Sequence, residues 1–311
     1  MLSYKNLSRY GRQVYLLKRI RVIGIIFIAI FVVLAVFLIA SQVKKGVKSE
    51  RQELLQVWNE GNFEKSYEIS KNALDLSPVD YLLLTINGFS AYQLGISQIN
   101  NQNILKFINE CIFSLRKALL QKESAKDGRV YYVLGKAYYY KGAEYADLAV
   151  KYLETANTLG YLASDIPEYL GLSYAAYGDY RSSIEAFTRA FDPEKPLADN
   201  FLIAIARSYI AMEEYNVAQG YLKRCIDFSP DSRSVIKARM LSAEIYAACE
   251  DYDNAMTQYQ TILSDSGENS EVHFQLGEIF LLKGDTTRAR SEWRTAYRLD
   301  PAHARARARL N

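Results

Sequence analysis

Apolar residues recur at helical spacing along most of the chain, and the pattern is clearest between residues 270 and 303. Two apolar faces are present there, each made of positions three or four residues apart. The first face carries Leu276, Gly277 and Phe280, and the second carries Ala289, Trp293 and Ala296. Polar residues 283–285 separate the two faces, and Pro301 follows the second. The pattern predicts two amphipathic helices joined by a short turn.

The same pattern returns upstream at a fixed interval. Tyr246, Ala255 and Tyr259 precede Phe280, Ala289 and Trp293 by 34 residues each. Small residues recur where two helices must approach closely, and large ones where the pair needs filling. The pattern resembles the tetratricopeptide repeat, a 34-residue helix–turn–helix unit. Residues 270–303 match its signature positions except the first, where His273 replaces the usual Trp.

We count seven such units: residues 47–80, 81–125, 128–163, 164–197, 199–232, 236–269 and 270–303. The 128–163 unit has two additional residues in its turn. The 81–125 unit has about eleven additional residues, which include the polar run 97–103. The resemblance implies an all-α fold, a right-handed superhelix over residues 47–303 with a concave groove. The basic tail, residues 304–311, is expected to begin a solvating cap helix or, alternatively, a docking patch for an acidic partner or lipid headgroups.

A continuous apolar run precedes the repeats. Residues 22–40 contain no charge, and 19 residues span roughly 28 Å as a helix, close to the thickness of a bilayer core. We therefore predict a single membrane-spanning helix, an uncleaved signal anchor, over residues 22–41. A cleaved signal peptide is the alternative, but its apolar core is usually about 7–15 residues long. A buried soluble helix seldom stays apolar on all sides for this length.

The flanking charges predict an orientation for this helix. Residues 1–21 carry six Lys or Arg and no acid, whereas residues 41–60 carry four Lys or Arg. The positive-inside rule places the basic N-terminus in the cytosol and the repeats across the inner membrane, in the periplasm or its equivalent. Since the formal net charge is +3, the chain after residue 21 carries −3. A slightly acidic ectodomain is not typical of a nucleic-acid-binding protein.

Little in the composition favours catalysis. The chain has two His and three Cys, the Cys are far apart, and no C-x-x-C pair is present. No phosphate-binding, zinc-protease or nucleophile-elbow motif occurs. We expect no enzyme activity, no cofactor, no metal site and no small-molecule substrate. Cys111, Cys225 and Cys249 are expected to be packing residues.

The concave groove is the predicted binding site. In this family, ligand contacts come from the second, fifth, ninth, twelfth and thirteenth positions of each first helix. Carried onto this sequence, the positions that favour binding are Phe89, Tyr92, Arg129, Tyr132, Lys136, Tyr139, Tyr140, Asn200 and Arg207. The far end offers acids instead: Glu244, Glu271 and Glu278. The Lys and Asn clamp of chaperone-binding relatives is absent, because the ninth positions here are Phe89, Lys136, Leu172, Arg207, Glu244 and Glu278.

The composition of the groove predicts that its ligand is an extended peptide or a helix of a protein partner, because aromatic residues give contact area and charges set the register of the ligand. The resemblance is to membrane-anchored repeat scaffolds of the bacterial envelope, which act in assembly or quality control. A periplasmic collar around a flagellar motor is a more specific form of such an envelope scaffold. An organellar import receptor with cytosolic repeats is another class, and an accessory subunit of an envelope enzyme is a third. A groove face that binds nothing specific is the remaining alternative.

Overall fold

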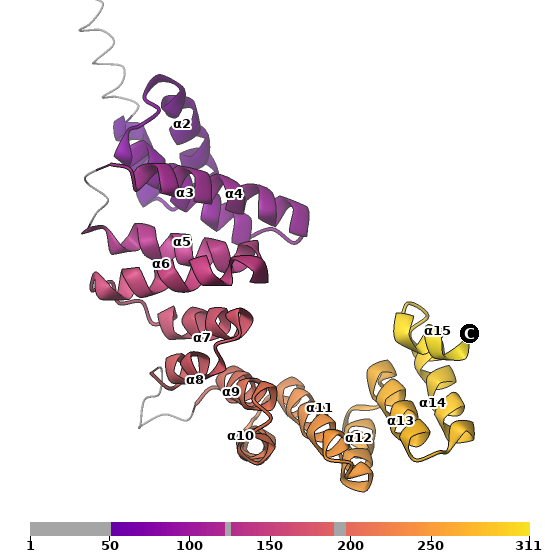
Figure 1. Cartoon of the computed structure of the whole chain (residues 1–311). Helices are drawn as coiled ribbons and strands as arrows, with labels where there is room; N and C mark the ends of the chain where they lie inside the picture. Colours follow the sequence, from indigo (N-terminus) through magenta and orange to yellow (C-terminus); the bar gives the residue numbers. More distant parts are fainter. Residues whose placement is uncertain (1–50, 122–125, 190–196) are drawn as a thin grey trace, which may run out of the picture.

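The computed structural model describes residues 51–121, 126–189 and 197–311. Within these ranges all regular secondary structure is helical, and the helices form seven successive pairs followed by one short helix (Figure 1). The pairs are residues 51–59 with α2 (Phe63–Leu76), α3 (Tyr81–Ile96) with α4 (Asn101–Ala118), α5 (Gly128–Lys141) with α6 (Ala146–Thr158), α7 (Ile166–Tyr177) with α8 (Tyr180–Arg189), α9 (Asp199–Ala211) with α10 (Tyr215–Phe228), α11 (Ser232–Ala248) with α12 (Tyr252–Ser266), and α13 (Ser270–Leu282) with α14 (Thr286–Leu299). The last helix is α15 (Ala304–Leu310), and a 3₁₀ turn, η3 (Ala143–Tyr145), joins α5 to α6. The predicted all-α helical repeat is confirmed.

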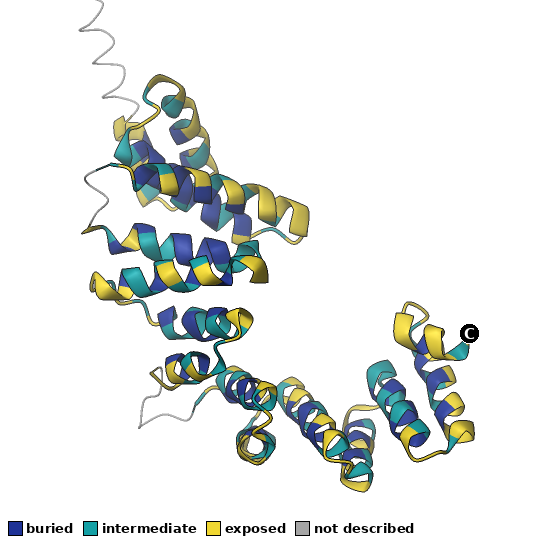
Figure 2. Ribbon diagram, in the orientation of Figure 1, coloured by how far each residue is buried: buried dark blue, intermediate teal, exposed yellow. Residues whose placement is uncertain are grey.

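The pairs stack in chain order along a curved path (Figure 1). The two helices of each pair pack on each other, and the second helix also packs on the first helix of the next pair. Successive first helices touch as well: α3 contacts α5, α5 contacts α7, α7 contacts α9, and α9 contacts α11. Like helices approach most closely on the inner side of a curved stack, so the first helices line the inner face. The buried positions run between the two helices of each pair (Figure 2).

Each pair closes through a small residue on the first helix that faces a large one on the second. A Cβ built on Gly277 would lie 2.5 Å from the Trp293 ring, so any larger residue would force the helices apart. Gly88 faces Leu115, Gly135 faces Leu153 and Gly171 faces Phe187 at similarly short distances. This recurring contact is the physical cause of the 34-residue period, because it fixes where the second helix can sit on the first.

The first described pair inverts this rule. Leu54 and Ser70 occupy the two facing positions, with the large residue on the first helix, and both are fully buried. The Ser70 hydroxyl oxygen accepts a hydrogen bond from Asn87 Nδ2 at 3.1 Å, and Ser114 Oγ donates to Asn87 Oδ1 at 2.8 Å. Asn87 is 1% exposed, so these bonds satisfy a side chain that would otherwise be costly to bury. A polar contact therefore joins the first two pairs.

The additional residues of the second pair are mostly helical. α3 and α4 contain 16 and 18 residues, longer than the 13 and 14 of α13 and α14. Residues 101–103 of the polar run form the first turn of α4, where the side chain of Asn100 accepts a hydrogen bond from the Gln102 amide. The longer hairpin reaches beyond its neighbours (Figure 1).

The last helix, α15, covers the end of the array with a dense set of contacts. Arg305 Nη2 donates to both carboxylate oxygens of Glu271, at 2.7 and 2.6 Å, and Arg309 Nε donates to Glu278 at 3.0 Å. His303 caps the helix, since its Nδ1 accepts a hydrogen bond from the Ala306 amide at 3.1 Å. The proton of the neutral imidazole must then lie on Nε2, 3.2 Å from the Glu271 carboxylate. Ala306 is fully buried by this packing.

The predicted membrane helix, residues 22–41, and the basic N-terminus, residues 1–21, lie outside the described residues. Among the residues that are described, no helix combines the length and the apolar character needed to cross a bilayer. The right-handed sense of the superhelix stays a prediction.

Candidate protein-binding groove

Five tyrosines from three successive first helices gather on the inner face. Tyr92 comes from α3, Tyr132, Tyr139 and Tyr140 from α5, and Tyr169 from α7. The rings contact edge to face: Tyr92 with Tyr140 at 6.2 Å between centroids, Tyr139 with Tyr140 at 5.4 Å, and Tyr139 with Tyr169 at 5.2 Å. The Tyr140 and Tyr169 hydroxyls are 3.1 Å apart and share a hydrogen bond. We call these five residues the tyrosine cluster.

Lys136 is enclosed by the cluster. Its ammonium nitrogen lies 4.4 Å from the centroid of the Tyr169 ring, 5.0 Å from that of Tyr132 and 5.6 Å from that of Tyr92, all within cation–π range. The residue is 9% exposed. Nζ also donates to Asp165 Oδ2 at 2.7 Å and to the Tyr132 hydroxyl at 3.0 Å. The charge expected to contact a ligand is therefore paired inside the protein.

The same contacts set the ionisation of the cluster. Burial alone would raise the pKa of Asp165, but hydrogen bonds from Lys136 and Tyr132 hold that pKa below its usual value. Burial raises the pKa of Tyr132, Tyr92 and Tyr169 well above the ordinary value. The three phenols stay neutral, and the Lys136–Asp165 pair carries no net charge.

The hydroxyl of Tyr92 is buried and has no hydrogen-bond partner among the described residues. Tyr92 is 4% exposed, so solvent does not compensate for the missing bond. A buried polar group without a partner costs about 1–3 kcal/mol. Such a cost is tolerated most often at sites that have a role beyond folding.

The other predicted groove residues lie in separate environments. Phe89 packs against Trp58 of the first pair, with ring centroids 6.2 Å apart, and against the core that the second and third pairs share. Arg129 pairs with Asp127, the residue that caps its own helix, at 2.8 Å. Asn200 is exposed, and its amide donates to Glu168 at 3.1 Å. Arg207 is exposed on α9 and, of the predicted groove cations, is the one that the groove leaves open to a ligand.

The expected acidic far end is largely neutralised by the chain itself. Glu271 and Glu278 pair with Arg305 and Arg309 of α15. The sequence placed both acids in the groove and both arginines in the tail, but did not connect them. The acidity expected of the far end is therefore offset at Glu271 and Glu278. Glu244, on α11, stays exposed.

Tyr169 is the site residue that sequence reasoning missed. It occupies the sixth position of its first helix, one residue after Glu168, and the five groove positions considered do not include it. Its ring nevertheless contacts Lys136, Tyr139 and Tyr140. The signal available was the density of tyrosine itself, 25 in the chain.

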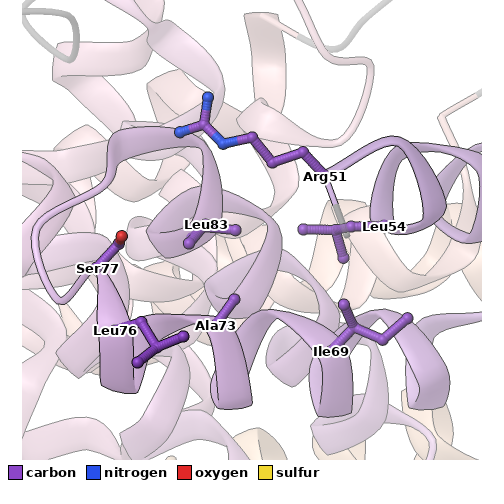
Figure 3. A pocket seen from close by; sticks show the side chains of 7 residues that line it. All are labelled: Arg51, Leu54, Ile69, Ala73, Leu76, Ser77 and Leu83. Atoms are coloured by element: carbon purple, nitrogen blue, oxygen red, sulfur yellow. The ribbon is translucent and has the colours of Figure 1, made fainter. Parts of the chain in front are cut away.

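A cavity at the N-terminal end of the described array is too small to serve as a site. It is lined mostly by apolar side chains, including Leu54, Ile69 and Leu83, with Arg51 at its edge (Figure 3). Its volume is about 20 Å³, room for roughly one water molecule. The Arg51 guanidinium pairs with Asp80 rather than turning into the cavity.

The described residues contain no group of three or more His, Cys, Asp or Glu side chains placed to hold a metal ion. Cys111 and Cys225 are buried, and Cys249 is exposed at the end of α11. The arrangement on the inner face offers aromatic contact area, a few open polar groups and internally paired charges. These features are suited to binding rather than to bond making.

These features define a class, a helical-repeat protein whose first helices carry an aromatic inner face. Comparison with known proteins identifies the fold within that class. A crystal structure of the C-terminal part of a TPR repeat-containing protein from Cytophaga hutchinsonii superposes with a TM-score of 0.57 at 14% identity, covering 84% of this chain and 99% of that one. A tetratricopeptide repeat protein from Parabacteroides merdae gives 0.54 at 15% identity, covering 85% and 97%. The chain therefore has the tetratricopeptide repeat fold.

Sequence similarity to known proteins says less about this chain than structural similarity does. The anaphase-promoting complex subunit CDC16 of Saccharomyces cerevisiae is 25% identical over 148 residues, which is 46% of this chain and 17% of that protein. The match thus spans less than a fifth of the length of that relative. No family model matches the chain.

Proposed function

We propose that this protein is a non-enzymatic, membrane-anchored scaffold that binds protein partners through the inner face of its repeat array. The observation that carries the proposal is the tyrosine cluster, in which three consecutive first helices contribute rings to one surface. Tyrosine gives a large rigid contact area with a polar tip, which makes it common at protein interfaces. Repeat arrays of this fold are typically scaffolds rather than enzymes.

The partner that fits best is an extended peptide or a helix laid along the inner face. Its central part would contact the tyrosine cluster, and its flank would meet Asn200 and Arg207 on α9. Because Lys136 and Asp165 neutralise each other, the cluster offers apolar and hydrogen-bonding contacts rather than a net charge. Arg207 and Glu244, which are both exposed and interact electrostatically with each other, would set the register of the partner.

Site-specific photocrosslinking tests this proposal. A photoreactive phenylalanine analogue at Arg207 lies on the inner face, whereas the same analogue at Lys223 of α10 lies on the second helix of the same pair, with 74% of the Lys223 side chain exposed. The full-length protein is irradiated in its native membrane, and adducts are identified by mass spectrometry. We expect a specific protein adduct from position 207 and none from position 223. Equal adducts from both positions, or an adduct from position 223 alone, would refute binding through the inner face.

The proposed location is the inner membrane, with the N-terminus in the cytosol and the repeats outside it. The uncharged residues 22–40 and the six basic residues within 1–21 support it. Protease added outside spheroplasts should digest the repeats. Complete protection, lost only after lysis, would support cytosolic repeats and hence the import-receptor alternative.

A further inference from the structure

A cavity lies against Tyr139 and Tyr140 of the tyrosine cluster. It is bordered by the end of α5, by η3 and the start of α6, and by α7. The turn between α5 and α6 is lengthened by the two additional residues of this unit, and part of it forms η3. Gly142 begins this turn with φ of 138°, a conformation that favours glycine. The longer turn packs against α7 through η3 and forms one side of the cavity.

The cavity has a volume of about 340 Å³, within the range of roughly 300–1,000 Å³ found for ligand pockets. Its larger wall consists of Tyr139 and Tyr140, whose rings meet at 79°. The remaining wall is made of small residues, including Ala143, Ala146 and Ala176. None of the side chains that line it is charged. A flat apolar group with a ring can pack against such a perpendicular pair of rings.

A second observation points to an occupant with a polar edge. Ser173 also borders the cavity, is fully buried, and its hydroxyl has no hydrogen-bond partner among the described residues. Tyr92, whose buried hydroxyl also lacks a partner among the described residues, packs its ring against that of Tyr140. The Ser173 hydroxyl would gain a bond if a ligand that opened the wall slightly brought a donor or acceptor.

Lys136, between Tyr92, Tyr132 and Tyr169, is paired with Asp165 and supplies no net charge beside the cavity. A cationic ligand would find no carboxylate among the side chains that line the cavity. An anionic ligand would find no cationic side chain on the cavity wall. The chemistry that remains is an uncharged aromatic ring with a hydrogen-bonding atom.

We infer that this cavity is an anchor pocket that accepts an aromatic side chain with a polar edge, tyrosine or tryptophan, from the protein partner. The inference rests on the proposed function and adds to it which side chain the partner presents and where it enters. The ring would pack against Tyr139 and Tyr140 and exchange a hydrogen bond with Ser173.

The test uses full-length protein in mild detergent with methyl-labelled alanine and the probe N-acetyl-tyrosinamide. Ala143, Ala146 and Ala176 give reporter methyl signals in the wall itself. We expect these signals to shift saturably. N-acetyl-leucinamide should bind at least fivefold more weakly, because it lacks the ring, and N-acetyl-phenylalaninamide should fall between the two, because it lacks only the hydroxyl.

A matched pair of variants locates the binding. Ala176→Leu fills the cavity from an exposed position of α7, and Ala211→Leu makes the same change at the corresponding exposed position of α9, which does not line it. Ala176→Leu should weaken tyrosinamide binding at least tenfold, and Ala211→Leu by less than twofold. The methyl signals of buried Ala296 and Ala306 report that the array remains folded.

Several outcomes would overturn the inference. These are the absence of saturable shifts at the wall alanines, equal binding by leucinamide, or undiminished binding by folded Ala176→Leu. The result is separable from that of the crosslinking experiment. A partner adduct at position 207 without tyrosinamide binding would refute the anchor pocket and leave the proposed scaffold function standing. Tyrosinamide binding without any partner adduct would refute the proposed scaffold function but not the presence of the pocket.

Discussion

Replacing Asp165 by Asn should destabilise the inner face locally, because it keeps the shape of the side chain and removes one charge of the Lys136–Asp165 pair. Removing one partner of a fully buried pair typically costs about 3–5 kcal/mol. Here the Lys136 side chain is 11% exposed but that of Asp165 is 32% exposed, so solvent screens part of the loss. The remaining amide oxygen can still accept from Tyr132. We expect a cost of about 2 kcal/mol.

Native-state hydrogen exchange measures this cost where it arises. A repeat array need not unfold in one step, so a single global free energy of unfolding would average over the pairs. Since each 1.4 kcal/mol is tenfold, protection of the α5 and α7 amides should fall by about 30-fold in Asp165→Asn. Amides of α13, at the other end, serve as the internal reference and should be unchanged.

A double-mutant cycle separates the ion pair from other effects of the substitution. Lys136→Met removes the cation and keeps much of the apolar stem. We expect the double variant to lose about 1.5 kcal/mol less than the sum of the two single variants. A coupling below about 0.5 kcal/mol, or a fall in protection of less than about threefold for Asp165→Asn, would refute the view that this pair stabilises the inner face.

The same pair gives a pH dependence with a definite sign. The pKa of Asp165 is lowered in the folded protein, so its contribution is fully present above the unfolded-state pKa of about 3.9. The contribution is lost as the pH falls through the lower folded-state value. The protection of the wild type and of Asp165→Asn should therefore converge below about pH 4. A difference that stayed constant down to pH 2.5 would contradict this assignment.

Two further predictions concern packing. Gly277→Ala should cost about 1–3 kcal/mol in the hydrogen-exchange protection of α13 and α14, because its Cβ would meet Trp293. Gly220→Ala, with nothing within 4 Å of its Cβ, should increase the protection of α10 by about 0.5–1 kcal/mol. Changes of the same sign in both variants would contradict the close-approach argument. Cys249 should react with a thiol reagent in the folded protein, while Cys111 and Cys225 should react only on unfolding. Burial raises the pKa of the Cys225 thiol to about 11 and that of the Cys111 thiol further. The order of modification is measured by mass spectrometry, and modification of either buried thiol before Cys249 would refute this prediction.

The sequence was sufficient to predict the helix pairs because their period comes from a local requirement. Gly277 and Trp293 face each other for steric reasons, and the same demand recurs in unit after unit. Even the irregular second pair could be aligned, because Gly88 and Leu115 keep this contact across the added residues. The register of the repeats could therefore be read from the sequence without knowing the curvature of the stack.

The site was less predictable because its chemistry depends on contacts between units. Lys136 was a predicted groove residue, but only the stacking of the α7 unit on the α5 unit brings Asp165 within 2.7 Å of it. Arg305 and Glu271 are likewise distant in sequence and were assigned to different regions. Position rules within one repeat can place a charge on a face. They do not show whether a neighbouring repeat has already neutralised it.

The inverted contact of the first pair has a consequence for modularity. In the regular units the small residue lies on the first helix, so one such unit could in principle replace another in an engineered or duplicated array. A unit with Leu54 and Ser70 could not be exchanged in this way, because Ser70 also holds Asn87 of the following unit, which in turn holds Ser114. A transplanted regular unit would bring a large side chain to the position of Ser70 and remove the acceptor that Ser70 provides for Asn87 Nδ2. The first two units can therefore be exchanged or duplicated only together.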